Sequence, residues 1–442
     1  MNNSPDDGAM LLVAYQCGPG IGSVSQLGWQ WFTGLAKGRS VCLVTHVRNR
    51  AAIESATDRP ADARVLYIDT EWFAGPLYRM SKRLFPRSEH AVFMVSQLDW
   101  FVFDVVALRT LRCELAAGAP WRLLHLVTPV TVSAPTRLHR LGLPVVRGPL
   151  NCGLPVPPGF ESLMRDDAMG LSRLRVLPRL MEVIFGSLRH SAAVLVATAA
   201  TRAALPAAVR SRSVRLLENA VDPTRFPAAA PIAAPGPGRP LRVSFVGRLV
   251  AVKALPLLLH AMASLRTQGV PVMLDVVGDG PMALPWREQA AVLGLADRVH
   301  WHGALPAAGV AGAVRRSHVF CLPSVRESGG AVLLEAMACA RPVIGMDFGG
   351  PAEVVDEAVG WKVAMPDEGT AIEGLTRTLR EVYERPEEAA RRGLQARQRI
   401  LDQHTWAARI AAAEALYASL LSAGSGAGRS ARSAAGSAAL RA

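Results

Sequence analysis

Short apolar runs alternate with segments of helical spacing along the C-terminal half of the chain. The first run, residues 241–246, ends at Gly247, and residues 255–266 repeat apolar positions with the period of a helix. The predicted strands of this half are 241–246, 272–277, 299–302, 318–322, 342–346 and 360–364. Strands that alternate with helices of this length predict βαβ units and a parallel sheet covered on both faces.

The N-terminal half shows the same alternation. A glycine-rich turn, residues 18–23, follows the first strand and leads into a predicted helix over residues 27–36. The predicted strands are 10–15, 41–45, 65–68, 122–127, 145–147, 193–197 and 214–217. The fold class is therefore α/β, with two Rossmann-like doubly wound domains that face a central cleft. Ligands are expected in that cleft, at the carboxyl ends of both sheets.

The pattern also predicts the boundaries of the domains. Residues 1–220 form the N-terminal domain and residues 221–405 the C-terminal domain, and a helix over 406–422 is expected to pack back toward the N-terminal domain. The stretch 227–240, rich in Ala, Pro and Gly, predicts a linker or surface loop. Residues 423–442 are rich in Ala, Ser and Gly with three arginines and no acid, which predicts a disordered tail.

Composition narrows the class of protein. Half of the 442 residues are hydrophobic and 19% are charged, which excludes wholesale disorder. The most apolar stretch, 91–108, contains Asp99 and Asp104, and Asp6 and Asp7 are unlike the start of a secretory signal. The six cysteines contain no CxxC pair, so neither a disulfide framework nor a zinc site is predicted. These features predict a soluble, cytoplasmic protein.

The net charge of +13 indicates an anionic partner. Before residue 221 the chain has 25 basic and 16 acidic residues, so most of the excess lies in the N-terminal half. Nucleic acid, acidic lipid and phosphorylated small molecules all suit such a surface. No nucleic-acid-binding module is recognised, and nucleic acid is therefore not expected as a partner.

Two clusters have the chemistry of a binding site. The first C-terminal strand is followed by Gly247 and Arg248, and Lys253 comes five residues later. The fork-shaped guanidinium of arginine and the compact ammonium of lysine both suit a diphosphate. The alternative is that both cations are simply solvated. Glu327 lies in a loop before Gly329 and Gly330, and Glu335 lies within an apolar helical run. Two such carboxylates can bind the hydroxyls of an extended ligand. The alternative is that one of them stabilises the helix dipole and the other lies on a solvated face.

These motifs, taken in order, resemble the donor half of glycosyltransferase family 4, whose members are retaining sugar transferases of the GT-B fold. Further motifs of the resemblance are 218–222 with Phe226 at the domain junction, and 278–281, 349–354, 18–29, 125–128, 141–144 and 148–149. The resemblance implies a hexosyltransferase that uses a nucleotide-diphosphate sugar and a glycan or lipid-linked acceptor. The expected pathways are polysaccharide, lipopolysaccharide or glycolipid biosynthesis. No cofactor and no metal are expected.

The resemblance also implies the role of each site residue. The N-terminal domain would bind the acceptor and the C-terminal domain the nucleotide sugar. The catalytic set would be Arg248, Lys253, Glu327 and His125. The donor-binding set would be Gly22, Ser23, Gly247, Arg248, Lys253, Ser328, Gly329, Gly330 and Glu335. Arg248 and Lys253 would bind the diphosphate, Glu335 the ribose, and Glu327 with the amides of 328–330 the donor sugar. His125 would face the transferred sugar, although a histidine in an apolar strand is also typical of a core.

Some positions depart from the family pattern. The departures are Val24, Ser25 and Gln26 in the first turn, Asn151 and Cys152 where glycines are usual, and Ala254 and Cys339-Ala340. The altered turn favours an alternative, a non-catalytic membrane-associated protein of the same fold that binds the donor without transfer. Glycines 18, 20 and 22 after a strand suggest a nicotinamide oxidoreductase as a further alternative, but their spacing is not GxGxxG.

Residues 72–87 interleave aromatic and aliphatic residues with cations. This pattern fits either a solvated cationic helix or a segment that contacts an anionic membrane. An anionic membrane surface is therefore a candidate partner, with the protein peripheral on the inner face of the cell membrane.

Overall fold

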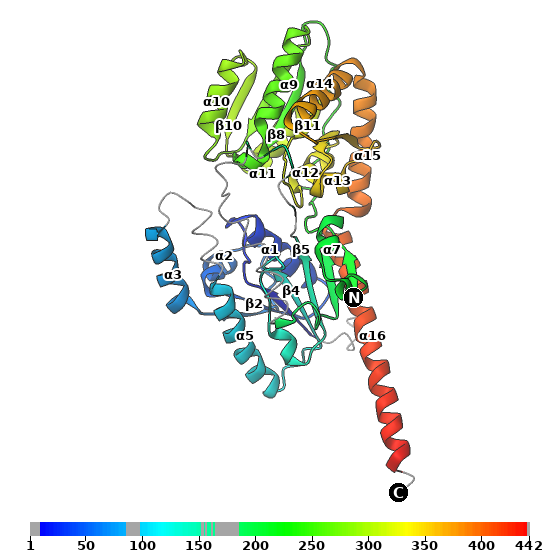
Figure 1. The fold of residues 1–442 in the computed structure, drawn as a ribbon. Coiled ribbons are helices and arrows are strands. Elements are labelled where there is room, and N and C mark those ends of the chain that lie inside the picture. The colour runs from blue at the N-terminus through cyan, green and yellow to red at the C-terminus, as the bar shows by residue number, and fades with distance from the viewer. Residues whose placement is uncertain are drawn as a thin grey trace.

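The computed structural model describes residues 9–84, 98–151, 154, 157–160, 162–163 and 185–439, with side chains described up to residue 423. Its N-terminal part contains a parallel sheet of seven strands in the order β3-β2-β1-β4-β5-β6-β7 (Figure 1). The strands are β1 (Met10–Ala14), β2 (Val41–His46), β3 (Arg64–Ile68), β4 (Leu123–Thr128), β5 (Val145–Leu150), β6 (Ala193–Val196) and β7 (Ser213–Arg215). The order reverses between β1 and β4, which is where doubly wound sheets bind ligands.

Helices cover both faces of this sheet. They are α1 (Ser23–Leu35), α2 (Arg50–Glu54), α3 (Glu71–Leu84), α5 (Asp99–Ala116), α7 (Ala199–Ala204) and α8 (Ala207–Arg210). Within β1, Met10 and Leu12 pack in the core that contains α1, whereas Leu11 and Val13 pack in the core that contains α5. Burial on both faces explains why these strands are continuous apolar runs without polar alternation.

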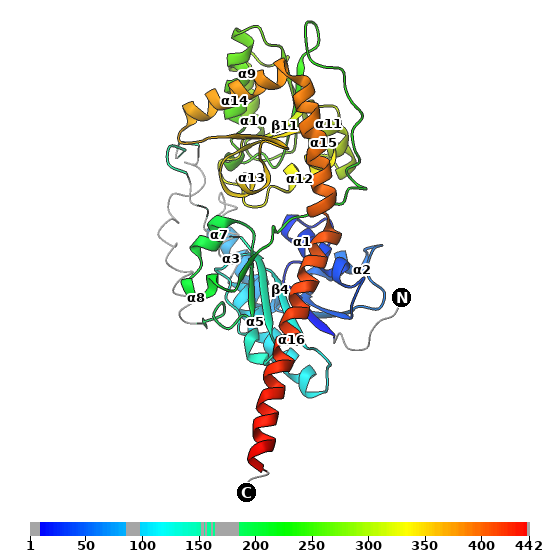
Figure 2. The ribbon, with the colours of Figure 1, turned by 90° about the vertical axis from the view of Figure 1, so that its right-hand side faces the viewer.

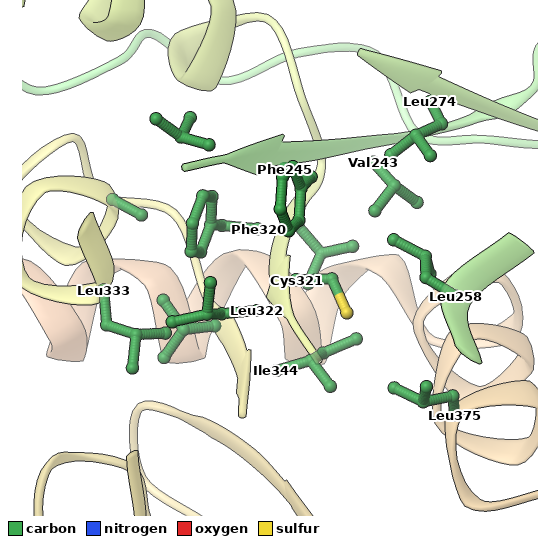
Figure 3. Packing of buried hydrophobic residues seen from close by; sticks show 14 of the residues in the cluster. Val243, Phe245, Leu258, Leu274, Phe320, Cys321, Leu322, Leu333, Ile344 and Leu375 are labelled. Atoms are coloured by element: carbon green, nitrogen blue, oxygen red, sulfur yellow. The ribbon is translucent and has the colours of Figure 1, made fainter. Parts of the chain in front are cut away.

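The C-terminal part repeats the architecture with six parallel strands in the order β10-β9-β8-β11-β12-β13. The strands are β8 (Leu241–Val246), β9 (Val272–Val277), β10 (Val299–Gly303), β11 (Val319–Leu322), β12 (Val343–Met346) and β13 (Gly360–Val363). The helices are α9 (Leu255–Thr267), α10 (Ala283–Val292), α11 (Ala307–Arg315), α12 (Ala331–Ala338), α13 (Gly349–Val354), α14 (Glu368–Glu384) and α15 (Pro386–Gln403). In the core, Phe245 and Phe320 of neighbouring strands lie close to Leu322 and Leu333 (Figure 3).

The chain returns to the N-terminal domain at its end. After α15, which packs on α12, α16 (Trp406–Ala439) runs along the N-terminal domain beside α1 (Figures 1 and 2). Tyr417 and Ala413 of α16 are buried in the core that contains α1. In the structure α16 continues to Ala439, whereas the sequence predicts a disordered tail from residue 423.

The sequence prediction of the α/β class with two doubly wound domains is confirmed, and each predicted strand is present in the corresponding sheet. Within the described residues, no helix is both long enough and apolar enough to cross a membrane.

Candidate donor site at the carboxyl edge of the C-terminal sheet

The loop after β8 contacts the loop after β9 through glycine backbone. The Gly247 amide donates to the Val277 carbonyl at 3.0 Å, and a Cβ on Gly278 would lie 1.9 Å from the Gly247 oxygen. Gly278 has φ 134° and Gly280 has φ 158°, and a Cβ on Gly280 would lie 2.4 Å from the Leu249 oxygen. The 278–281 motif therefore fixes the path of the loop that presents the exposed Arg248.

Lys253 ends a short 3₁₀ turn, Ala251–Lys253, ahead of α9. The next residue, Ala254, has the left-handed conformation with φ 46°, and Ala340 has φ 58°. Both alanines stand where the family pattern has glycine. A residue with a Cβ in this conformation costs about 1–2 kcal/mol, which explains why glycine is usual there.

Lys253 and Glu327 meet as an ion pair, although they come from loops after different strands. Their side chains are only 18% and 13% exposed, so the pair is largely shielded from solvent. Glu327 also accepts a hydrogen bond of 3.3 Å from the Gly330 amide, and the Val325 amide donates to the Val252 oxygen at 3.0 Å. The loops after β8 and β11 thus form one unit that brings a predicted cation and a predicted carboxylate together.

The segment Glu327–Gly330, called the donor loop below, is enclosed by close backbone packing. The Gly350 amide donates to the Glu327 carbonyl at 2.8 Å. A Cβ on Gly349 would lie 2.2 Å from the Glu327 oxygen, and a Cβ on Gly350 would lie 2.4 Å from the Ser328 oxygen. The 349–351 motif therefore supports the donor loop from behind, and only glycine fits at its first two positions.

Glu335 lies on α12, directly after the donor loop. Its side chain is partly buried, and within the described ranges no group hydrogen-bonds or pairs with its carboxylate. Burial raises the pKa of Glu335 to about 7, while Arg225 lowers it. A half-buried carboxylate without a protein partner is costly in the ligand-free state, and a ligand that supplies hydroxyl donors would relieve that cost.

The glycine-rich turn of the N-terminal domain leads into the start of α1. Gly20 and Gly22 have φ 74° and 126°, conformations that favour glycine, and both are exposed together with Ser23. The first turn of α1 contains no acidic residue, and no side chain caps it. The first turn therefore contributes no carboxylate of its own that would compete for these amides. Among the described residues, no hydrogen bond joins Gly22 or Ser23 to the donor loop.

His125, which the resemblance assigns to the transferred sugar, lies inside the core of the described structure. The imidazole is fully buried in β4 and contacts the Gly148 carbonyl through Nε2 at 2.6 Å and the Tyr417 hydroxyl through Nδ1 at 2.7 Å. Trp31 packs edge-on against the ring. Burial lowers the pKa of His125 to about 4, so the ring is neutral and both nitrogens are satisfied inside the core. Its assignment to the transferred sugar stays a prediction.

Sequence reasoning missed Glu218, although the residue lies in the junction motif. Its side chain is only 7% exposed, and its carboxylate contacts both Asn151 and Ser328. A glutamate in an otherwise ordinary loop sequence gives no sign of burial. Its place in the junction motif, residues 218–222, was the signal in the sequence that could have pointed to it.

In the part of the chain that the structure describes, no group of three or more His, Cys, Asp or Glu side chains is placed to hold a metal ion.

Part of the chain is similar to known sugar transferases. Residues 234–399 match the family model described as "Glycosyl transferases group 1". The chain is 30% identical over 210 residues to a 2-deoxystreptamine glucosyltransferase from Streptomyces kanamyceticus. The aligned region covers 45% of this chain and 53% of that protein. It is 32% identical over 172 residues to a GDP-mannose-dependent phosphatidylinositol monomannoside mannosyltransferase from Mycolicibacterium smegmatis, covering 37% and 44%. The chain thus spans about half the length of these curated relatives.

Solved structures resemble the chain along nearly its whole length. A sucrose-phosphate synthase from Thermosynechococcus elongatus aligns with TM-score 0.62 and 19% identity, covering 94% of this chain and 99% of that one. HepE from Anabaena in complex with UDP aligns with TM-score 0.60 and 14% identity, covering 93% and 99%. The fold is therefore GT-B, with both domains present.

Proposed function

We propose that the protein is a retaining glycosyltransferase that moves a hexose from a nucleotide-diphosphate sugar to a glycan or lipid-linked acceptor. The observation that carries this proposal is the half-buried Glu335 carboxylate, which has no partner among the described residues. It lies on the helix that follows the loop of the Lys253–Glu327 pair, inside the segment that matches the group 1 family model. The similarity of the fold to HepE, which was solved with UDP, adds support for a nucleotide ligand. The family match favours this function over a nicotinamide oxidoreductase.

In the proposed reaction, each residue of the donor site has one task. Glu335 accepts hydrogen bonds from the ribose hydroxyls, and Arg248 with Lys253 binds the diphosphate. Because Lys253 pairs with Glu327 in the ligand-free protein, donor binding must share or exchange that cation. Glu327 and the amides of the donor loop are then available to orient the sugar hydroxyls.

The chemistry requires neither a paired carboxylate nor a cofactor. The bond between the anomeric carbon and the diphosphate oxygen breaks, and the acceptor oxygen forms its bond on the same face of the sugar. The acceptor proton passes to the departing phosphate oxygen. Arg248 and Lys253 stabilise the charge that develops on that oxygen, which is preorganised electrostatic catalysis. The start of α1 adds partial positive charge from the N-terminal domain.

Turnover of sugar nucleotides tests this proposal. Wild-type protein is incubated with UDP-, GDP- and ADP-hexoses and an acceptor panel, and nucleotide release and glycoside formation are measured. Arg248→Ala and Glu335→Ala are expected to abolish transfer while the protein stays folded. Arg242→Ala is the matched control, because this exposed arginine lies at the opposite end of the same strand, β8, and should leave activity unchanged.

The anomeric configuration of the product, measured by NMR, tests the stereochemistry. A product with the donor's configuration supports a retaining enzyme, and an inverted product contradicts it. Donor binding without transfer or hydrolysis over a broad acceptor panel would instead favour the non-catalytic alternative. Full activity in both site variants would refute the assignment of the donor site.

We also propose that α3 contacts an anionic membrane. Its buried face consists of Ala74, Leu77 and Ser81, which leaves Trp72 and Leu84 exposed at 67% and 63%. The exposed cations of the helix are Arg79, Lys82 and Arg83. Apolar side chains interleaved with cations suit the headgroup region of an acidic leaflet, where a lipid-linked acceptor would be found. Residues 85–87 of the predicted segment lie outside the described residues.

Cosedimentation with vesicles tests this contact. Wild-type protein should sediment with phosphatidylglycerol-containing vesicles and not with phosphatidylcholine alone. Trp72→Ser combined with Leu84→Ser should lose that binding. Leu284→Ser removes an equally exposed apolar side chain, 65% exposed, from α10 of the C-terminal domain and should keep it. Equal binding by both variants would contradict a role for α3.

A further inference from the structure

Glu218 lies at the junction of the two domains, between β7 and the first residues of the C-terminal domain. The side chain is 7% exposed, although no cation is recorded against its carboxylate among the described residues. A buried carboxylate without a cation is unfavourable unless hydrogen bonds satisfy it. The contacts that satisfy Glu218 come from both domains.

On the N-terminal side, the contact is Asn151, which directly follows β5. Its Nδ2 atom donates to both carboxylate oxygens of Glu218, at 2.9 and 3.1 Å. The backbone amide of Asn151 donates in turn to the Val130 carbonyl at 2.6 Å. The amide side chain that holds Glu218 is therefore anchored to the loop after β4 in the N-terminal domain.

On the C-terminal side, the contact is the donor loop itself. The Ser328 hydroxyl donates to Glu218 Oε1 at 3.4 Å. A Cβ on Gly329 would lie 2.2 Å from the same oxygen and 2.3 Å from Asn219 Nδ2. The donor loop thus lies directly on the carboxylate, and a residue larger than glycine would displace one or the other.

Electrostatics link Glu218 to the proposed chemistry as well. Burial raises the pKa of Glu218 to about 7, the Asn151 hydrogen bond lowers it, and the charge of Glu327 raises it further. Glu327 is the partner of Lys253, the cation assigned to the diphosphate. When the diphosphate draws Lys253 away, Glu218 faces a less neutralised Glu327.

We propose that Glu218 is a positioning residue that joins the donor loop to the N-terminal domain, through the Asn151–Glu218–Ser328 contacts. This inference rests on the proposed function, because the donor loop is assigned to the sugar of the donor. Glu218 would not touch the substrate. It would set where Ser328 and the following amides stand when the two domains enclose the donor.

A second carboxylate across the domain junction supplies a matched control. Glu353 on α13 accepts a 2.7 Å hydrogen bond from the Ala199 amide and lies 3.4 Å from Arg215, and both partners belong to the N-terminal domain. Within the described part of the chain, neither its hydrogen bond nor its ion pair involves the donor loop. Glu353→Gln therefore weakens a contact between the domains without touching residues 327–330, whereas Glu218→Gln changes the contact to the loop at nearly constant volume.

The test compares kinetics of Glu218→Gln, Glu353→Gln and wild type with the sugar nucleotide that the wild type uses. In Glu218→Gln the new amide faces the Asn151 amide donor, and one charge-assisted hydrogen-bond acceptor is lost. We expect kcat to fall at least about tenfold while affinity for the free nucleotide changes less than about twofold. Glu353→Gln should keep kcat within about twofold. The double variant N151D/E218Q exchanges donor and acceptor and should recover part of kcat.

Three outcomes would overturn the inference. The first is an unchanged kcat in Glu218→Gln. The second is an equal loss in Glu353→Gln, which would mean that any junction contact suffices. The third is a parallel loss of nucleotide affinity and kcat, which would mean general damage to the site.

Hydrogen–deuterium exchange separates failure of this inference from failure of the proposed function. A wild type without turnover would refute the proposed function alone. Faster exchange at residues 327–330 in Glu218→Gln, but not in Glu353→Gln, would still support the link to the loop. Unchanged exchange in both variants would refute it.

Discussion

Gly329→Ala is the sharpest steric test of how the donor loop is held. The added Cβ would lie 2.2 Å from Glu218 Oε1 and 2.3 Å from Asn219 Nδ2, whereas such contacts essentially never fall below 3.0 Å. The loop or the carboxylate must therefore move by about 0.8 Å or more. Overpacking of a well-packed site costs roughly 1–3 kcal/mol, and a cost near 2 kcal/mol lowers Tm by about 4–8 °C in a domain of this size.

Thermal unfolding and turnover are measured on the same preparations. We expect Gly329→Ala to melt earlier than wild type and to lose kcat, because the displaced loop no longer presents Ser328 and Gly330 correctly. Gly236→Ala is the control, since its Cβ would meet no atom within 4 Å and its φ is ordinary. A Gly329→Ala protein with wild-type Tm and wild-type kcat would refute the described packing of the donor loop.

Three further variants test individual side chains. Burial raises the pKa of Glu335 from its ordinary value of 4.5 to about 7. Between these two pH values the folded protein keeps a proton on Glu335 that the unfolded chain releases. The free energy of unfolding therefore falls as the pH rises from 4.5 through 7. Glu335→Gln should therefore raise the Tm of the ligand-free protein at pH 8 but not at pH 4, and should weaken nucleotide binding; equal Tm changes at both pH values would contradict this. Lys253→Met should weaken nucleotide binding at least about tenfold by calorimetry, because the diphosphate loses a charge-assisted contact, and unchanged affinity would remove Lys253 from the site. Tyr417→Phe leaves buried His125 Nδ1 without its 2.7 Å partner and should lower the free energy of unfolding by about 1–2 kcal/mol in denaturant melts, with kcat unchanged. A lower kcat at full stability would support the predicted catalytic role of His125.

The strands could be predicted from the sequence because of where they lie. Parallel strands buried on both faces must be apolar along their whole length, and runs such as 241–246 therefore stand out between helical segments. The positions of the loops that contain Lys253 and Glu327 could also be predicted, because glycines and charged residues directly follow those strands.

What could not be predicted depends on contacts far along the chain. His125 has the same sequence context in a core and in a site, and its buried partner Tyr417 lies 292 residues away. Glu218 is buried only because Asn151 and Ser328, 67 and 110 residues away, converge on it. No local pattern records such convergence.

The measurement that tests the central claim most directly is a thermal-shift series with UDP, GDP and ADP, each with and without magnesium. A nucleotide at about one hundred times its Kd adds nearly 3 kcal/mol of stability, which is a readable shift. The account predicts a shift with one nucleotide that magnesium leaves unchanged, that Arg248→Ala and Glu335→Ala abolish, and that Arg242→Ala retains. A shift that persists in both site variants, or no shift with any nucleotide, would contradict the donor site described above.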